Sequence, residues 1–301
     1  MDATIARAPE ALTAGSLTFS PLAWGMWRFA GQEPARARAL VEAAFEAGIT
    51  LFDTADIYGF GGEGFGAAEA LLGRVFRESP GLRDRMVLAS KGGICPPVPY
   101  DSSAAYLTAA CEASLARLGV DHLDLYQIHR PDLLAHPAEV AGALEALRTA
   151  GKIREVGVSN YTAAQTAALQ AHLSFPLVTH QPEFSPLATT PIEDGILDQA
   201  LERGMRVLAW SPLGGGRLGG PSEDPRVQRV QAALDRVAER EGVSRTALAY
   251  AWIMAHPTRA VPIVGSQDPA RIREASDALK VRLDRTEWYA ILVASRGVPM
   301  P

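Results

Sequence analysis

The sequence predicts an α/β protein built as a closed (β/α)8 TIM barrel in a single domain. Short apolar runs alternate eight times with segments of helical spacing, which is the order expected of a parallel sheet whose strands are joined by helices. Polar, ionisable side chains stand where several of these runs end. The length of 301 residues suits one such barrel, so we expect a single domain over residues 1–301.

The expected elements share a pattern of apolar strand, turn and amphipathic helix. The predicted strands are 17–27, 49–53, 86–90, 123–128, 153–158, 177–179, 205–209 and 261–264. The predicted helices are 34–47, 67–76, 102–118, 137–149, 162–172, 191–203, 225–240, 244–256, 269–279 and 285–294. Two helices therefore follow the seventh strand, and one more closes the chain.

Composition narrows the class of protein. With 48% hydrophobic and 21% charged residues, the chain is typical of a soluble globular protein with a large core. The net charge is −5 without a long Lys and Arg cluster, so we expect no nucleic acid partner. No apolar run is long enough to span a bilayer. Cys95 and Cys111 lack metal-ligand spacing, and no secretory leader is evident, so we expect a cytoplasmic protein without a metal site. The oligomeric state is not determined by these patterns.

The segment 49–59 is the most informative stretch. It begins as an apolar strand after Gly48 and ends in a turn that carries Asp53 and Tyr58. Taken alone, the Asp is typical of a turn cap and the Tyr of packing. The other strand ends change this interpretation, because the carboxyl ends of barrel strands converge on one face, where the active sites of such enzymes lie.

Residues that are costly to bury follow several different strands. Asp, Lys and His at separate strand ends are unusual as packing residues and together indicate a site. The strand-end residues are Gly25, Met26, Trp27, Asp53, Tyr58, Lys91, His129, Ser159, Asn160, Gln181, Trp210, Ser211, Gly265 and Ser266.

An open, doubly wound sheet is the competing architecture. Gly59, Gly61 and Gly64 have the G-x-G-x-x-G spacing of a dinucleotide-binding turn. That fingerprint places its first Gly directly after the strand, whereas here a polar turn of five residues intervenes. We therefore interpret the three glycines as a flexible loop.

The ordered motifs resemble the aldo-keto reductase superfamily, and within it a bacterial branch with a His-Arg-Pro-Asp turn at 129–132. The similarity extends over nearly the whole chain. Its motifs are 52–59 (Phe-Asp-Thr-Ala-Asp-Ile-Tyr-Gly), Glu69 with 72–73, 90–91, 121–125, 151–154, 157–160, 210–214, 265–266 and 271–272.

The resemblance implies a catalytic tetrad of Asp53, Tyr58, Lys91 and His129 that reduces aldehydes or ketones by hydride transfer. A free Tyr has a pKa near ~10, too high for efficient proton transfer at neutral pH. An ammonium about 4 Å away contributes on the order of 4 kcal/mol at an effective dielectric of about 20, or about three pKa units. We therefore expect Lys91 to lower the pKa of Tyr58 and Asp53 to hold Lys91 charged. His129 is expected to hydrogen-bond the substrate carbonyl or to help relay the proton.

The resemblance also implies an NADP(H) site, with NAD(H) as an open alternative. The nicotinamide carboxamide is expected on Ser159, Asn160 and Gln181, with Trp210 against the ring. The pyrophosphate is expected under the loop of Ser211, Leu213, Gly214, Gly216 and Arg217, where glycines allow backbone amides to approach an anion. The remaining cofactor contacts are expected from Gly25, Met26 and Trp27 on one side and Gly265, Ser266 and Arg271 on the other.

Two departures weaken the cofactor assignment. Many family members have Lys where Gly265 stands and Asn where Ala275 stands, so one phosphate contact and one adenine contact are absent. A small carbonyl compound is the expected substrate, with Trp27, Ile57 and Arg130 lining its pocket.

Two other functions fit the same residues. A lyase or aldolase could use Lys91 as the nucleophile of a Schiff base. A regulatory or redox-sensing subunit could bind nicotinamide nucleotide with little turnover. A metal-dependent hydrolase is disfavoured, because no ligand cluster stands at a strand end.

Overall fold

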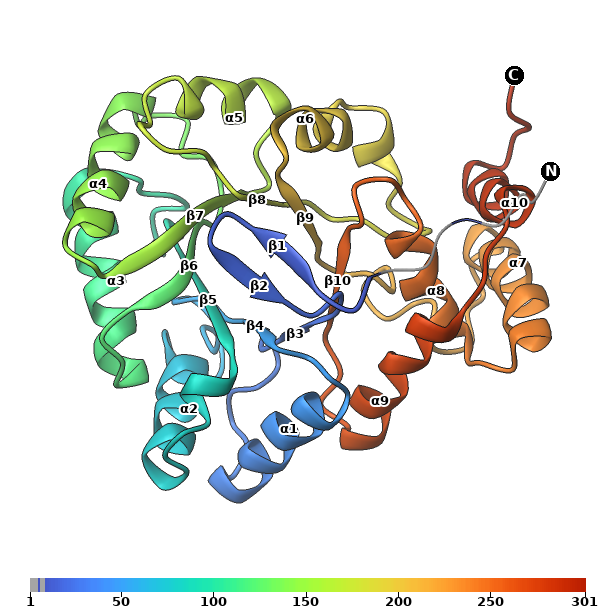
Figure 1. Cartoon of the computed structure of the whole chain (residues 1–301), viewed down its shortest axis with the longest axis horizontal. Helices are drawn as coiled ribbons and strands as arrows, with labels where there is room; N and C mark the ends of the chain where they lie inside the picture. Colours follow the sequence, from blue (N-terminus) through green and yellow to red (C-terminus); the bar gives the residue numbers. More distant parts are fainter. Residues whose placement is uncertain (1–4, 6–8) are drawn as a thin grey trace.

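The computed structural model describes residue 5 and residues 9–301, which form a closed barrel surrounded by helices (Figure 1). Eight strands close it in the order β10-β3-β4-β5-β6-β7-β8-β9, with every neighbouring pair parallel. The (β/α)8 architecture predicted from the sequence is confirmed, and the open sheet is wrong. The barrel strands are β3 (Ala23–Gly25), β4 (Leu51–Asp53), β5 (Val87–Gly92), β6 (Leu123–Ile128), β7 (Ile153–Ser159), β8 (Thr179–Gln181), β9 (Arg206–Ala209) and β10 (Val261–Val264).

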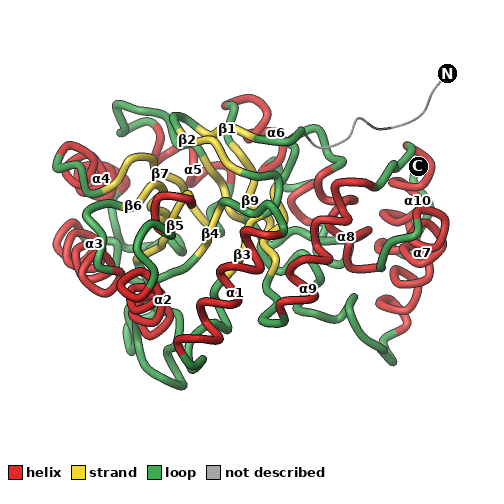
Figure 2. Tube along the Cα trace, turned by 60° about the horizontal axis from the view of Figure 1, so that its bottom comes forward, coloured by secondary structure: helices red, strands yellow, loops and turns green. Residues whose placement is uncertain are grey.

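The helices lie outside the strands, and α7, α8 and α10 gather at one side of the barrel (Figure 2). Polar caps begin many of them, as at α5, where Thr162 and Gln165 form a reciprocal capping box. The helices are α1 (Pro34–Glu46), α2 (Ala67–Glu78), α3 (Ala104–Leu118), α4 (Pro137–Thr149), α5 (Ala163–Gln170), α6 (Ile196–Arg203), α7 (Pro225–Glu241), α8 (Arg245–Met254), α9 (Pro269–Glu274) and α10 (Arg285–Arg296).

Three expected elements are wrong in their bounds. The helix expected over 191–203 is a 3-10 turn, Thr190–Ile192, followed by α6, because Gly195 adopts φ 83° and interrupts it. The helix expected over 269–279 changes to a 3-10 turn at Ala275–Lys280. The sixth strand lies two residues later than expected, so that Gln181 is its last residue.

The strand expected over 17–27 is two separate elements. Its first part, β2 (Leu17–Phe19), pairs antiparallel with β1 (Leu12–Ala14), and only β3 belongs to the barrel. A turn at Gly15, with φ 57°, joins the hairpin. The β1-β2 hairpin lies across the end of the barrel that faces the viewer in Figure 1.

The interior of the barrel is apolar beneath the hairpin. Side chains alternate between lumen and exterior along each strand, so residues two apart share a face. Apolar residues of the hairpin pack against apolar residues of the barrel strands. Together they form one buried cluster of Leu12, Ala14, Leu17, Phe19, Ala23, Leu51, Ala89, Leu125, Val178, Leu208, Val261 and Ile263. The same alternation that points Leu51 and Ala89 into the lumen also points Asp53 and Lys91 there, one layer above.

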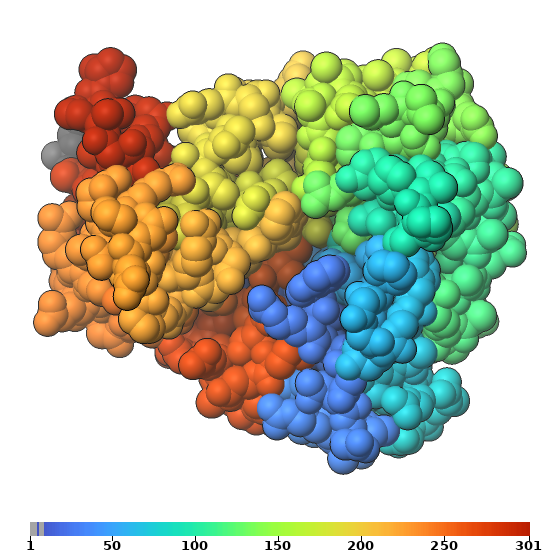
Figure 3. All heavy atoms as spheres, turned by 180° about the vertical axis from the view of Figure 1, so that it is seen from behind, coloured from blue at the N-terminus to red at the C-terminus, as the bar shows by residue number. Residues whose placement is uncertain are grey.

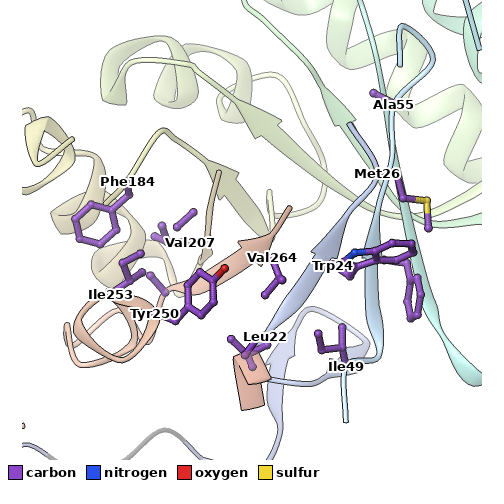
Figure 4. Packing of buried hydrophobic residues seen from close by; sticks show 14 of the residues in the cluster. Leu22, Trp24, Met26, Ile49, Ala55, Phe184, Val207, Tyr250, Ile253 and Val264 are labelled. Carbon is purple, nitrogen blue, oxygen red and sulfur yellow. The ribbon is translucent and has the colours of Figure 1, made fainter. Parts of the chain in front are cut away.

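A second, larger core fills the space between the strands and the helices. Trp24 on β3 packs edge-on against Phe29 and Phe52, and Met26 lies beside it (Figure 4). Outside β10, Trp252 of α8 stacks on Trp288 of α10 at 4.9 Å between ring centroids. The strands are thereby covered on their outer face as a parallel sheet requires.

The packing of the β1-β2 hairpin on the barrel leads to a prediction about stability. Phe19 is 2% exposed in the floor of the barrel, so Phe19→Ala should reduce the free energy of unfolding by about 3–5 kcal/mol, through lost burial and a residual cavity. Urea unfolding followed by circular dichroism measures this. Leu201→Ala on α6, where the side chain is 48% exposed, is the control and should change stability by less than about 0.5 kcal/mol. Equal effects of the two substitutions would contradict a structural role for the hairpin.

Candidate active site

The carboxyl ends of the barrel strands lie on the face opposite the hairpin. Seen from behind, this face is hollowed near its centre between segments drawn in blue, green and orange (Figure 3). The ends of β4, β5, β7 and β8 bring Asp53, Lys91, Ser159 and Gln181 to the lumen side of this hollow. Among the described residues, no cluster of His, Cys, Asp and Glu is arranged to hold a metal ion.

Lys91 is the central side chain of the site, and its ammonium is completely buried. Its Nζ donates hydrogen bonds to Asp53 Oδ2 at 2.7 Å, to the Thr54 carbonyl at 2.9 Å and to Tyr58 Oη at 3.1 Å. An ammonium has three N–H donors, so every donor of Lys91 is used. Because Tyr58 Oη accepts from Lys91, the hydroxyl hydrogen of Tyr58 is free to point toward another acceptor.

Charge at Lys91 is maintained by its partners. Burial alone would lower its pKa, but the Asp53 carboxylate and then Tyr58 outweigh burial and raise the pKa above its ordinary value. Asp53 is itself held at both oxygens, since Oδ1 accepts from Gln181 Nε2 at 2.9 Å. The side chains of Lys91, Asp53 and Gln181 therefore form one fixed chain across the lumen.

The pKa of Tyr58 differs from the sequence prediction. Burial raises it above the ordinary value, and the opposing effect of Lys91 is smaller than that of burial. The expected net lowering of this pKa is wrong, because desolvation of the phenolate outweighs the attraction of the Lys91 ammonium. Tyr58 is thus a protonated phenol at neutral pH.

His129 follows β6 and lies beside Tyr58, with 5.9 Å between the ring centroids. Burial, then Lys91 and Arg130, keep the pKa of His129 well below its ordinary value, so the imidazole is neutral near pH 7. Its Nδ1 is buried and has no hydrogen-bond partner among the described residues. A neutral imidazole still carries one N–H donor.

Trp27 and Ile57 border the same mouth. The Trp27 indole packs edge-on against Tyr58 at 5.1 Å between centroids and is 60% exposed. Ile57 is buried, and Arg130 is partly exposed next to His129. Gly25 and Met26, in contrast, are buried, and the Met26 amide donates to the Asp53 carbonyl.

The residues expected at the nicotinamide end already contact one another. Asn160, with φ 59°, donates through Nδ2 to the His129 carbonyl at 3.1 Å and to Ser159 Oγ at 2.9 Å. Its Oδ1 accepts from Trp210 Nε1 at 2.9 Å. Gln181 donates to Asp53 through Nε2 at 2.9 Å, and Ser159 Oγ donates to the Gln181 carbonyl at 2.9 Å.

The loop after Trp210 is a series of turns. Ser211, Gly214, Gly215 and Gly216 all have positive φ, and the Gly214 amide donates to the Ser211 carbonyl at 2.7 Å. The Gly216 amide donates to the carbonyl of Leu213, and Arg217 bends back to the Gly214 carbonyl at 2.8 Å.

Of the residues expected at the adenosine end, Gly265 and Ser266 follow β10, and Arg271 lies in α9. The carbonyl of Ser266 accepts from Trp24 Nε1 at 3.0 Å, and Gly265 is exposed. The Arg271 side chain is 74% exposed, and its Nε is 4.0 Å from Asp268 Oδ2. Arg271 therefore keeps most of its guanidinium available to solvent.

Two features of the site were missed by sequence reasoning. The Thr54 carbonyl accepts from Lys91, and a backbone acceptor gives no side-chain signal. Gln181 supports Asp53 as well as standing at the expected cofactor position. Gln181 and Thr179 are two residues apart on β8, so their side chains share the lumen face. This spacing is the sequence signal that could have predicted the support of Asp53.

The comparisons with known proteins agree with this architecture. A model of the aldo/keto reductase family matches residues 21–294, and the chain belongs to that family. It is 58% identical over 288 residues to a 6-dehydroglucose reductase of Novosphingobium aromaticivorans, covering 95% of this chain and 94% of the relative. It is 40% identical over 293 residues to a protein of the same name from Agrobacterium fabrum, covering 93% of this chain and 96% of that one.

A solved structure has the same fold. The glycerol dehydrogenase of Gluconobacter oxydans superposes with a TM-score of 0.82 at 27% identity, covering 100% of this chain and 98% of that one. The chain is accordingly an oxidoreductase of a family that acts on carbonyl compounds with nicotinamide cofactors. No described helix is both long and apolar enough to cross a membrane.

Proposed function

We propose that this protein reduces the aldehyde of 6-dehydroglucose to the primary alcohol of glucose with NADPH as the hydride donor. The three hydrogen bonds of Lys91 Nζ carry the chemical part of the proposal. Tyr58 Oη accepts one of them, so its own hydrogen remains available for donation to a substrate. The name shared by the relatives at 58% and 40% identity supports the substrate, in which C6 of the sugar is an aldehyde.

The roles of the residues follow from their geometry. NADPH, when bound, supplies the hydride that adds to the carbonyl carbon. Tyr58 gives its proton to the carbonyl oxygen as negative charge develops there, and Lys91 stabilises the phenolate that remains. Asp53 keeps Lys91 charged and aimed. His129, as a neutral imidazole, donates a hydrogen bond to the carbonyl oxygen. Solvent returns the proton to Tyr58 after the alcohol leaves.

The residues present fit a nicotinamide group. Buried His129 Nδ1 has no hydrogen-bond partner among the described residues, so the site has unused polar capacity next to the proposed nicotinamide position. The Gln181 side chain holds Asp53, so a carboxamide bound at Gln181 would be close to the reacting centre. Asn160 Nδ2 donates to Ser159 Oγ, and Ser159 Oγ donates to the Gln181 carbonyl, so both side chains are ordered next to Gln181. Arg271 would pair with a 2′-phosphate, and this is the basis for preferring NADPH over NADH.

The substrate pocket suits a polar, hydroxylated molecule. The exposed indole of Trp27 offers an apolar surface for the face of a hexose ring, and Arg130 offers charged donors for hydroxyl groups. We further propose a cytoplasmic location, which is supported by two free cysteines, Cys95 and Cys111.

The Schiff-base alternative is less consistent with the structure. A nucleophilic Lys must be neutral, whereas Lys91 donates all three hydrogens and has a raised pKa. The sensor alternative makes a different prediction, namely tight NADPH binding without turnover, and the following experiment distinguishes it.

Replacement of the proposed acid tests the mechanism. Tyr58→Phe should lower kcat for NADPH-dependent reduction of 6-dehydroglucose by about 10²–10⁴-fold, since general acid catalysis contributes about this much. NADPH binding, measured by quenching of protein fluorescence, should be unchanged. Tyr289→Phe on α10, where the side chain is 41% exposed, is the matched control and should retain the parent rate. A fully active Tyr58→Phe contradicts the mechanism, and a parent that binds NADPH but turns over no aldehyde favours the sensor.

Cofactor choice is tested at Arg271. Arg271→Ala should reduce the ratio of kcat/KM for NADPH to that for NADH by roughly 10- to 100-fold, the loss expected of a hydrogen-bonded pair with a charged phosphate. Arg273→Ala, two residues further along α9, is the control because Arg273 is paired with Glu46 at 2.5 Å. An unchanged ratio in Arg271→Ala would refute the proposed phosphate contact.

A further inference from the structure

A buried polar cluster lies outside the barrel lumen, between β5 and β6 on one side and α2 and α3 on the other. Ser90 and Tyr126 belong to the outward faces of their strands, since Lys91 and Gln127 alternate with them in the lumen. Ser90 accordingly bonds to Glu69 of α2. The cluster consists of Asp56, Glu69, Ser90, Arg117 and Tyr126, and Asp56 stands two residues before Tyr58 in the chain.

Glu69 is ion-paired with Arg117, the one cationic side chain of this cluster. Its Oε1 accepts from Ser90 Oγ at 2.5 Å, and its Oε2 accepts from Arg117 Nε at 2.8 Å and lies 2.7 Å from Arg117 Nη2. Glu69 is therefore a paired carboxylate, although it is fully buried. Arg117 is committed to it.

Asp56 has no comparable partner. Its side chain is 0% exposed, and neither oxygen makes a hydrogen bond of good geometry with a described residue; the nearby Ile57 amide only weakly favours its charged form. Tyr126 Oη is also unpartnered among the described residues and lies on the same side of β5. A Cβ placed on Gly92 would clash with Tyr126 Oη at 2.1 Å and be in ordinary contact with Asp56 Oδ2 at 3.5 Å, so both groups lie beside this glycine. An ionised Asp56 here would be a buried charge without a counter-ion, which is strongly unfavourable.

The surrounding charges favour the neutral acid. Burial, and then the Glu69 carboxylate on α2, raise the pKa of Asp56 to about 8, against smaller lowering effects from Arg117 on α3, the Ile57 amide and Lys91 on β5. The other titratable groups that face Asp56 are phenols: Tyr58, Tyr106 of α3 and Tyr126 of β6. Asp56 thus changes charge within the range of pH where an enzyme can work.

Asp56 and Tyr58 are coupled. The Asp56 amide donates to the Lys91 carbonyl at 3.1 Å, which joins the turn carrying Tyr58 to the strand carrying Lys91. A negative charge on Asp56 raises the pKa of Tyr58. By reciprocity, a tyrosinate would hold the proton on Asp56 more tightly.

We propose that Asp56 is a positioning residue that binds a proton at neutral pH, releases it to solvent at alkaline pH, and by its negative charge then keeps Tyr58 protonated. Aldehyde reduction needs the phenol form of Tyr58, so ionised Asp56 extends the reduction rate to higher pH. Alcohol oxidation needs the tyrosinate form, so ionised Asp56 shifts its onset to higher pH as well. This step rests on the proposed role of Tyr58. The charge change of Asp56 itself does not depend on that role.

Stability against pH tests the charge change without cofactor or substrate. A carboxyl with a folded pKa near 8 and an unfolded pKa near 3.8 holds more protons in the folded state between those values, so its contribution to stability falls as pH rises through this window. Asp56→Asn, which is isosteric and neutral, lacks this fall. The unfolding equilibrium constant of the parent relative to Asp56→Asn should rise about tenfold per pH unit from about pH 4 to about pH 8, then level off.

The exposed Asp121 supplies the control for loss of one carboxylate. Asp121→Asn should follow the parent at every pH. Parallel curves for the parent and Asp56→Asn would overturn the proposal. Should Asp56→Asn fail to fold, carbon NMR of the parent protein labelled at its aspartate carboxyl groups tests the same charge change. One aspartate carboxyl should titrate near pH 8, and the absence of any such carboxyl would overturn the proposal.

The pH profile of turnover tests the action on Tyr58. In Asp56→Asn, the alkaline fall of kcat/KM for aldehyde reduction should move to lower pH, and the rise of alcohol oxidation should move in the same direction. A merely structural role would lower both rates without shifting either profile, and that result would overturn the proposal. If the parent turns over no substrate, the proposed function fails, while the stability measurement still decides the charge of Asp56.

Discussion

The structure depends on one buried ammonium. Lys91 lies in an apolar barrel, where an unpaired charge would be neutralised, yet three acceptors from the end of β4 and the connection after it hold it charged. Removing water from this site makes each of those interactions stronger than it would be at a surface. The same arrangement orients Tyr58, because the phenol oxygen accepts from Lys91 and the phenol hydrogen is directed elsewhere. Orientation of a proton, more than a lowered pKa, is what the protein supplies at Tyr58.

The rest of the fold maintains that site. The β1-β2 hairpin closes the far end of the barrel with Phe19 and its neighbours, so the lumen beneath the polar layer is apolar. Gln181 holds the second oxygen of Asp53, and Asn160 links Trp210 to the backbone after β6. Behind the strands, Glu69 is paired with Arg117, whereas Asp56 in the same cluster has no such cation and its pKa is raised to about 8 by burial and by Glu69. Two buried carboxyl groups thus differ because only one of them has a cation.

Much of the fold could be predicted from periodicity, and the errors have physical causes. The alternation of strands and helices predicted the barrel, and strand ends predicted that Asp53, Lys91 and Gln181 meet. The hairpin was missed because 12–14 and 17–19 are too short to show a period, and the apolar run through Leu22 masked the break at Ser20 and Pro21. The pKa of Tyr58 was expected to fall because burial cannot be assessed from residue spacing. Asp56 was interpreted only as part of a motif. That its carboxyl group is buried without a cation beside it can be learned only from the three-dimensional structure.

The central claim is that Lys91 is a charged group stabilised by Asp53, and a double-mutant cycle of unfolding free energies tests it most directly. Lys91→Met leaves the Asp53 carboxylate without its cation, and Asp53→Asn leaves the ammonium with a neutral amide. Each single substitution should cost about 3–5 kcal/mol, because it strands a buried charge. The double variant strands neither, so it should cost clearly less than the sum of the two. Strictly additive losses would contradict the account.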